Sequence, residues 1–275
     1  MIHDYYLSKA KEYTDKEIAR NKKEILNKVL KDKEPNDIHN FYPNPEDLQN
    51  FPANSVLLKI SFTLKKPYIS KDEGEFHIIE DKIFKNPIVR DKFTGLPMVR
   101  PSTWKGHLRF ASRMVEWDKG NKEKIIRGLF GNESEEDALR GRLYFFPTFF
   151  EEEAGRDVIT PLKRDTRTPA RGPISLEVMK PGSKGNFYLL YVPYSQGKNF
   201  KEEEVEEDLR FLAKALQLMF YTYGFSAKKT SGFGVIEYLE EENVVVYPKR
   251  ERKYSQLYYV KSNDFGSEGN RNEAG

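Results

Sequence analysis

The order in which strand-like and helix-like segments follow one another constrains the fold most. Residues 55–64 alternate apolar and polar side chains for most of their length, which is typical of a half-buried strand. Residues 202–221 repeat apolar side chains every three or four positions, which is typical of a helix with one buried face. Such segments follow one another as strand, helix, strand, strand, helix, strand, over residues 55–64, 101–117, 142–146, 187–192, 202–221 and 235–239.

This order predicts an α+β fold with a ferredoxin-like (RRM-like) βαββαβ core, in which an antiparallel sheet carries both helices on one face. The opposite face would be free for a partner, and such a face suits RNA. The second helix begins with the acidic run 202–208, which is favourable to the helix dipole and is expected to be solvated. In the first helix, the predicted buried stripe comprises Trp104, Leu108, Ala111 and Val115.

Three regions of the chain differ in composition. Residues 1–50 are polar and rich in Lys and Glu for most of their length, and they predict an N-terminal polar helical arm. Residues 51–261 hold the ferredoxin-like domain, with inserted hairpins and loops at 65–100 and 150–185. Residues 262–275 are rich in Gly, Asn, Ser and Glu, which is typical of a disordered tail.

The residue types that are scarce exclude several kinds of chemistry. The 275-residue chain has no cysteine and four histidines, so thiol catalysis and a Cys-based zinc site are excluded and no metal is expected. Neither a Walker lysine motif nor a Gly-x-Gly-x-x-Gly motif follows a predicted strand, so we expect no cofactor. The sequence has no secretory signal and no run of about 18 apolar residues, which predicts a cytoplasmic protein without a membrane partner.

Positive charge is concentrated locally, although the formal net charge is only +3. Between residues 82 and 127, basic side chains far outnumber acidic ones. Within this region Lys105, Arg109 and Arg113 are spaced four residues apart, which places them on one side of the first helix. Ser102 lies at the start of that helix, where free N–H groups attract phosphate. The pattern predicts a track for nucleic-acid phosphates, although a solvated helix face gives the same pattern.

Two further segments combine basic residues with loop-forming ones. Residues 156–172 are basic, contain two prolines and have little helical period, so they predict a projecting loop or hairpin. Residues 224–234 are rich in glycine and connect the last helix to the last predicted strand. Their free N–H groups and two lysines would suit a phosphodiester, and a flexible connection without function explains the glycines equally well.

Short motifs in three parts of the chain complete the pattern. The first part comprises residues 86–91, 95–99 and 102–109. The second comprises residues 165–174, 177–178 and 185–187, and the third comprises residues 228–234. The first part contains Lys-Gly-x-x-Arg and the last ends in Gly-Phe-Gly. These motifs, in this order, resemble those of the repeat-associated mysterious proteins (RAMPs), the CRISPR-associated subunits built on ferredoxin-like folds. The resemblance covers about residues 57–237 and does not include the arm.

The resemblance implies a function as well as a fold. Type III effector complexes stack such subunits along a CRISPR RNA, so a backbone or end subunit that grips the guide RNA is expected. Its partners would be CRISPR RNA, target RNA and other subunits of an antiviral effector complex. With Arg113 added from the helix stripe, the residues expected at the RNA are Ser102, Lys105 and Arg109, then Arg164, Thr166, Arg167 and Arg171 of a hairpin inserted between nucleotides, and Lys228, Lys229 and Ser231.

One departure from the family's pattern concerns catalysis. Target-cleaving backbone subunits carry an Asp two residues before the Pro of the Pro-x-x-Arg-Asp motif, and here Lys85 stands two residues before Pro87. Because a lysine cannot replace that carboxylate, we expect no catalytic residue and no cleavage by this route. Asp81 or Glu80, on the same stretch, would be the carboxylates of a target-cleaving alternative. A second departure is Pro101, which replaces the glycine before the serine pair and affects the local turn.

Two other functions remain open on the sequence. A guide-processing endoribonuclease shares the ferredoxin-like architecture and the glycine-rich loop, and His107 would be its general base. A protein scaffold would instead use the basic face to contact an acidic subunit. RNA competition at low and high salt distinguishes the scaffold from a phosphate binder, because counterion release makes RNA affinity fall steeply with salt.

Overall fold

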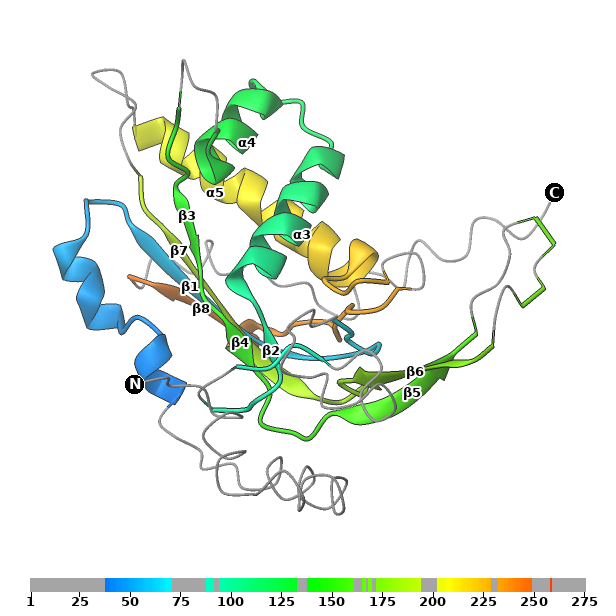
Figure 1. The fold of residues 1–275 in the computed structure, drawn as a ribbon. Coiled ribbons are helices and arrows are strands. Elements are labelled where there is room, and N and C mark those ends of the chain that lie inside the picture. The colour runs from blue at the N-terminus through cyan, green and yellow to red at the C-terminus, as the bar shows by residue number, and fades with distance from the viewer. Residues whose placement is uncertain are drawn as a thin grey trace.

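A computed structural model of the chain is shown in Figure 1. It describes residues 38–70, 88–91, 94–132, 138–160, 165–166, 168–169, 172–193, 202–228, 232–248 and 258. Most of the predicted arm and the predicted tail therefore lie outside the described residues. The same holds for several residues named above, which are Glu80, Asp81, Lys85, Pro87, Arg164, Arg167, Arg171, Lys229 and Ser231.

The centre of the fold is a four-stranded antiparallel sheet. Its strands are β1 (Val56–Thr63), β3 (Leu143–Phe145), β7 (Lys184–Tyr191) and β8 (Val244–Tyr247). They are arranged in the order β3-β7-β1-β8, and each neighbouring pair is antiparallel. The prediction of an antiparallel sheet combined with helices is confirmed, and its first three strands begin and end within a few residues of their predicted positions.

The predicted fourth strand is wrong. Residues 235–239 were expected to complete the sheet, but only Ile236 forms an isolated bridge there, with Leu64. Val235 and Ile236 are buried, but residues 235–239 form no ladder with the sheet beyond this bridge. The strand beside β1 is instead β8, in which Val244 and Val246 are buried in alternation with Val245 and Tyr247.

Three helices cover one face of this sheet (Figure 1). They are α3 (Pro101–Met114), α4 (Lys122–Phe130) and α5 (Glu202–Gln217), and α5 continues as the π-helical turn η5 (Leu218–Tyr223). The predicted helices correspond to α3 and to α5 with η5. The short helix α4 was not predicted, and it packs through Ile125 and Leu129, which are four residues apart on one face.

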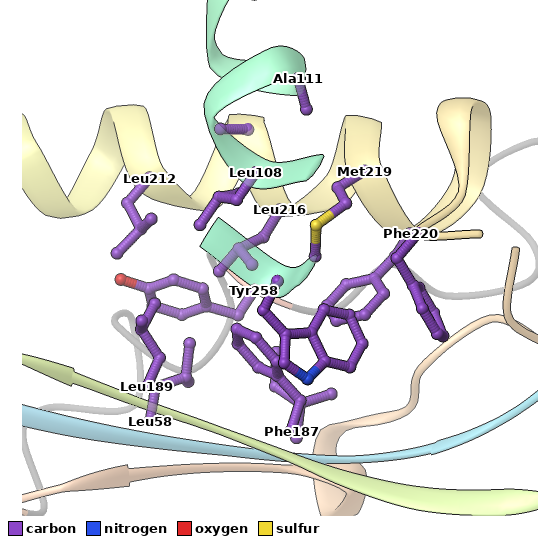
Figure 2. Packing of buried hydrophobic residues seen from close by; sticks show 14 of the residues in the cluster. Leu58, Leu108, Ala111, Phe187, Leu189, Leu212, Leu216, Met219, Phe220 and Tyr258 are labelled. Atoms are coloured by element: carbon purple, nitrogen blue, oxygen red, sulfur yellow. The ribbon is translucent and has the colours of Figure 1, made fainter. Parts of the chain in front are cut away.

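The main core lies between these helices and the sheet. Figure 2 shows Leu108 of α3 and Leu216 of α5 directed toward Leu58 and Leu189 of the sheet. All members of the predicted stripe on α3 are buried, because the helix lies against the sheet along that side. Trp104 is fully buried, and its indole donates to Thr148 Oγ1 at 3.2 Å, which satisfies the one polar atom that it brings into the core.

An ionic cluster attaches the start of α5 to the sheet. Arg142 donates to Asp208 at 2.5 Å and to Glu204 at 3.2 Å, and the Tyr191 hydroxyl donates to Asp208 at 2.8 Å. Burial raises the pKa of Tyr191 far above its ordinary value, so the phenol stays neutral and remains a donor. The acidic run was expected to be solvated, and Asp208 corrects this prediction because it is 3% exposed.

The opposite face of the sheet is partly covered, contrary to the prediction of a free face. Two 3-10 turns, η1 (Ile38–Phe41) and η2 (Pro45–Asn50), belong to the segment that covers it. Leu48 packs against Leu57 and Leu190, and the ring of Tyr42 stacks on Tyr188 with 4.1 Å between centroids. Apolar side chains on this face are thereby removed from water by the chain itself.

Two smaller antiparallel ladders complete the fold. β2 (Met98–Val99) pairs with β4 (Thr148–Phe149), and β5 (Gly155–Ile159) pairs with β6 (Ile174–Val178). The β5/β6 hairpin extends away from the sheet at the end opposite to α4 (Figure 1). Val158 of β5 is 59% exposed.

Candidate nucleic-acid interface

Helix α3 presents the predicted basic stripe on the side away from the core. Pro101 occupies the first turn, where its missing N–H costs nothing, so the departure at this position leaves the helix start intact. Ser102 and Lys105 are exposed, Arg109 is half-buried and Arg113 is exposed. The structure therefore keeps the four predicted residues of α3 on an accessible side of the helix.

Gly106 of the Lys-Gly-x-x-Arg motif has no structural reason within the described chain to be glycine. It lies inside α3 and is exposed, and a Cβ atom placed on it would meet nothing within 4 Å. A glycine inside a helix costs about 1 kcal/mol relative to alanine. Close approach of an external group to the helix backbone would explain why a side chain is absent here.

The glycine-rich loop is held firmly where it leaves η5. Gly224 and Gly234 have φ values of 70° and 78°, and a Cβ on either residue would overlap backbone atoms of the loop. The buried hydroxyl of Ser226 accepts from Ile69 N at 3.0 Å and donates to Ile69 O at 3.0 Å. Residues 224–228 and 232–234 of the loop therefore have a defined shape, and Lys228 is half-buried there.

The start of α3 and the glycine-rich loop are neighbours. The rings of Trp104 and Phe225 pack with centroids 4.3 Å apart, and Phe110 meets Tyr223 edge-on at 5.2 Å. These contacts place two of the predicted basic segments, which lie far apart in the sequence, next to each other.

The third predicted segment, the hairpin, is joined to the loop at its base. Phe233 of the glycine-rich loop packs against Ile69 and against Leu176 and Val178 of β6. Tyr68 and Met179 exchange backbone hydrogen bonds of 3.0 and 2.9 Å beside this cluster. Burial raises the pKa of Tyr68 to about 12, so its phenol stays neutral at physiological pH.

A buried ion pair connects the hairpin base to the residues that follow position 87. Arg90 Nη2 donates to Glu177 Oε1 at 2.5 Å, and Ile88 N donates to Glu177 Oε2 at 3.0 Å. The side chains of Arg90 and Glu177 are 5% and 13% exposed. Sequence reasoning used both residues only as parts of motifs and assigned neither of them a role. No local signal could have paired them, because they are 87 residues apart.

Within the described residues, the structure thus brings Ser102, Lys105 and Lys228 to neighbouring elements. Arg113 lies at the far end of α3. Thr166 is exposed, and its hydroxyl and that of Thr168 are 2.7 Å apart. The predicted site residues that lie outside the described ranges are Arg164, Arg167, Arg171, Lys229 and Ser231.

Of the residues named for the other functions, only His107 lies within the described ranges. His107 is half-buried on α3. Across these ranges, no group of three or more His, Asp and Glu side chains is placed to hold a metal ion. Nor does any described helix have the length and apolar character needed to cross a membrane. The accessible chemistry of this side of the domain is that of cations and backbone donors, which suits an anionic polymer.

Comparison with known proteins agrees with this arrangement. The family model described as the RAMP superfamily matches residues 67–237. This chain belongs to the RAMP superfamily. The matched residues include α3, the β5/β6 hairpin and the glycine-rich loop, which are the elements that meet in the interface. The sheet strands β1 and β8 lie outside the matched residues and complete the sheet around them.

Curated relatives in the superfamily are similar over more than half of this chain. A protein of Streptococcus thermophilus named "CRISPR system Cms endoribonuclease Csm3" is 24% identical over an alignment of 176 residues that covers 59% of this chain and 78% of that protein. The protein of the same name from Mycobacterium tuberculosis is 29% identical over 176 residues, covering 55% of this chain and 73% of that protein.

A solved structure shows the same fold. A chain in a cryo-EM structure of the type III-B Cmr-beta complex, bound to cognate target RNA, superposes with a TM-score of 0.52. The two chains are 17% identical, and the match covers 86% of this chain and 77% of the other. At this identity the likeness concerns the fold alone.

Proposed function

We propose that this chain is a CRISPR RNA-binding subunit of a type III effector ribonucleoprotein complex, which grips the guide RNA backbone in antiviral defence. The observation that carries the proposal is the exposed Lys105-Gly106 pair on α3, beside the glycine-rich loop. A cation next to an open stretch of helix backbone supports contact with a phosphate and its sugar. Membership of the RAMP superfamily and the relatives named as CRISPR proteins support the same role.

The fold at the finer level belongs to the same proposal. We infer a ferredoxin-like core, because α3 and α4 lie between β1 and β3 in sequence and α5 lies between β7 and β8. With the sheet order β3-β7-β1-β8, this is the connectivity expected for a βαββαβ unit. Residues 1–50 would be an appended arm and 65–100 and 150–185 insertions into the core, of which the β5/β6 hairpin is one.

RNA binding by the full chain tests the proposed function. Lys105→Glu combined with Arg109→Glu should weaken binding to single-stranded RNA by a similar factor for unrelated sequences, because backbone contacts carry no sequence information. Arg210→Glu is a matched control, since Arg210 is an exposed arginine on α5 that pairs with Glu206 at 2.6 Å. Unchanged RNA affinity in the double variant would remove α3 from the RNA site.

Catalysis is a separate part of the proposal. The relatives are named endoribonucleases, but Lys85 stands at the position expected for the carboxylate of target-cleaving subunits. We propose that the chain binds RNA without cleaving it by that route. Target RNA cleavage with Mg²⁺ that is lost in Asp81→Ala would establish the cleaving alternative instead. Guide processing that is lost in His107→Ala with RNA binding retained would establish the processing alternative.

A further inference from the structure

A groove between α3 and α4 carries positive charge that the residues considered so far only partly account for. Its volume is about 410 Å³. It is lined by Arg109, Arg113, Glu123, Ile126, Arg127, Gly131 and Asn132. Three of these side chains are guanidinium groups and one is a carboxylate, so the groove is cationic overall.

The arginines of the groove are suited to an anion. Arg109 is half-buried, and its Nε is buried without a hydrogen-bond partner among the described residues. A buried donor without a partner is unfavourable, and a bound anion would satisfy it. Arg113 is exposed at the rim, where its planar group is free to bind two oxygens of one phosphate.

Contacts within the chain fix the shape of the groove. Lys122, the first residue of α4, donates to the carbonyl oxygens of Arg113 and Val115 at 2.7 Å each, which fixes the start of α4 to the end of α3. The side chain of Asn121 accepts from Lys124 N at 3.0 Å and caps α4. Both helices also pack into the core. Arg109 and Arg113 on α3 therefore line one wall of the groove, and Arg127 on α4 lines the other.

We propose that this groove binds a phosphodiester group of the RNA strand that passes along α3. The inference rests on the proposed function and extends the RNA site to α4, with Arg127 as an additional binding residue beside Arg109 and Arg113. Continuity favours RNA over an acidic protein segment. Arg109 belongs both to the exposed stripe and to the groove, and Arg113 lies about 12 Å along the helix from Lys105 at 1.5 Å per residue. One extended strand can therefore contact both places.

Measurement of RNA affinity with single-charge variants of the full chain tests this site. Arg113→Gln and Arg127→Gln should each weaken binding of a fluorescein-labelled single-stranded RNA by about tenfold, the usual effect of losing a charge-assisted hydrogen bond. Each should also reduce the slope of log affinity against log salt by about 0.7. Arg210→Gln, which removes the same charge from α5, should change neither, and thermal unfolding of each variant verifies that it folds.

Including Lys105→Gln separates failure of this inference from failure of the proposed function. If Lys105→Gln weakens RNA binding while Arg113→Gln and Arg127→Gln do not, the groove is not an RNA site and the proposed function stands. If none of the variants changes RNA affinity, both are overturned. If Arg113→Gln abolishes binding of polyglutamate but not of RNA, the groove contacts protein and the inference is overturned.

Photo-cross-linking gives a positional measurement that needs no substitution in the groove. RNA containing 4-thiouridine, bound to the unmodified chain, should cross-link to a peptide that includes residues 122–130, as identified by mass spectrometry. Cross-links confined to peptides from the start of α3, from the glycine-rich loop or from the hairpin would contradict the inference.

Discussion

Arg90 and Glu177 form a buried ion pair, with 2.5 Å between Nη2 and Oε1, across 87 residues of sequence. Glu177 lies on β6 at the base of the hairpin, and its second oxygen accepts from Ile88 N. One carboxylate thus fixes the hairpin base to residues 88–90.

Removing one partner of this pair should destabilise the domain. Glu177→Gln leaves Arg90 buried without a counter-charge, and such losses cost about 3–5 kcal/mol. The free energy of unfolding, measured with urea, should fall by roughly that amount. Glu206→Gln removes an exposed pair with Arg210 and should change it by less than about 1 kcal/mol. Equal effects of the two substitutions would contradict the role assigned to Glu177.

Replacing Gly106 should affect stability and RNA binding in opposite directions. Gly106→Ala adds a methyl group that meets nothing within 4 Å, so helix propensity should raise the free energy of unfolding by about 1 kcal/mol. The same methyl group would obstruct close approach of RNA to α3, so RNA affinity should fall, and it should fall further in Gly106→Leu. Unchanged affinity in both variants would show that nothing approaches the helix at this position.

Two glycines of the glycine-rich loop should differ in their tolerance of a side chain. At Gly234, alanine would combine a φ of 78° with overlap against Ser226, and we expect a loss of at least about 2 kcal/mol in unfolding free energy. At Gly232, which has a φ of 69° but open space around its Cβ, only the backbone strain of about 1 kcal/mol applies. Urea denaturation of both alanine variants checks whether Gly234→Ala loses more unfolding free energy than Gly232→Ala. Similar losses in the two variants would contradict a fixed loop shape.

Tyr68 should make the protein sensitive to alkali. Burial raises its pKa from 10.0 to about 12, so above pH 10.0 the unfolded chain loses a proton that the folded chain keeps. Stability is therefore fully present below pH 10.0 and falls as the pH rises toward 12, by up to roughly 3 kcal/mol from this residue. In Tyr68→Phe, urea denaturation at pH 8 and pH 11 should show a smaller difference than in the unmodified chain. An identical difference would exclude Tyr68 as the cause.

Much of the fold was predictable because its elements carry their own periodicity. The strand at 55–64 and the helices α3 and α5 bury one face each, and this burial is visible as a repeat of apolar residues. α4 was missed because it is short, and its apolar core residues Ile125, Leu129 and Phe130 span little more than one helical turn. The last strand was misplaced because two apolar segments follow α5, and only pairing with β1 distinguishes them.

The candidate interface was predictable only as separate segments. The stripe from Lys105 to Arg113 follows from helical spacing, and the motifs of the RAMP superfamily locate the loop and the hairpin. The neighbourhood of Trp104 and Phe225, and the buried pair of Arg90 with Glu177, result from packing between distant parts of the chain. Periodicity is a local property, so it gives no information on such contacts.

Recovery of bound RNA tests the central claim most directly. The chain would be purified from its native host under native conditions, and the accompanying nucleic acid and proteins would be identified by sequencing and mass spectrometry. The proposed function predicts short RNAs with a repeat-derived end, together with other effector subunits, and their loss in the Lys105→Glu, Arg109→Glu variant. A lone protein free of nucleic acid would contradict the proposal.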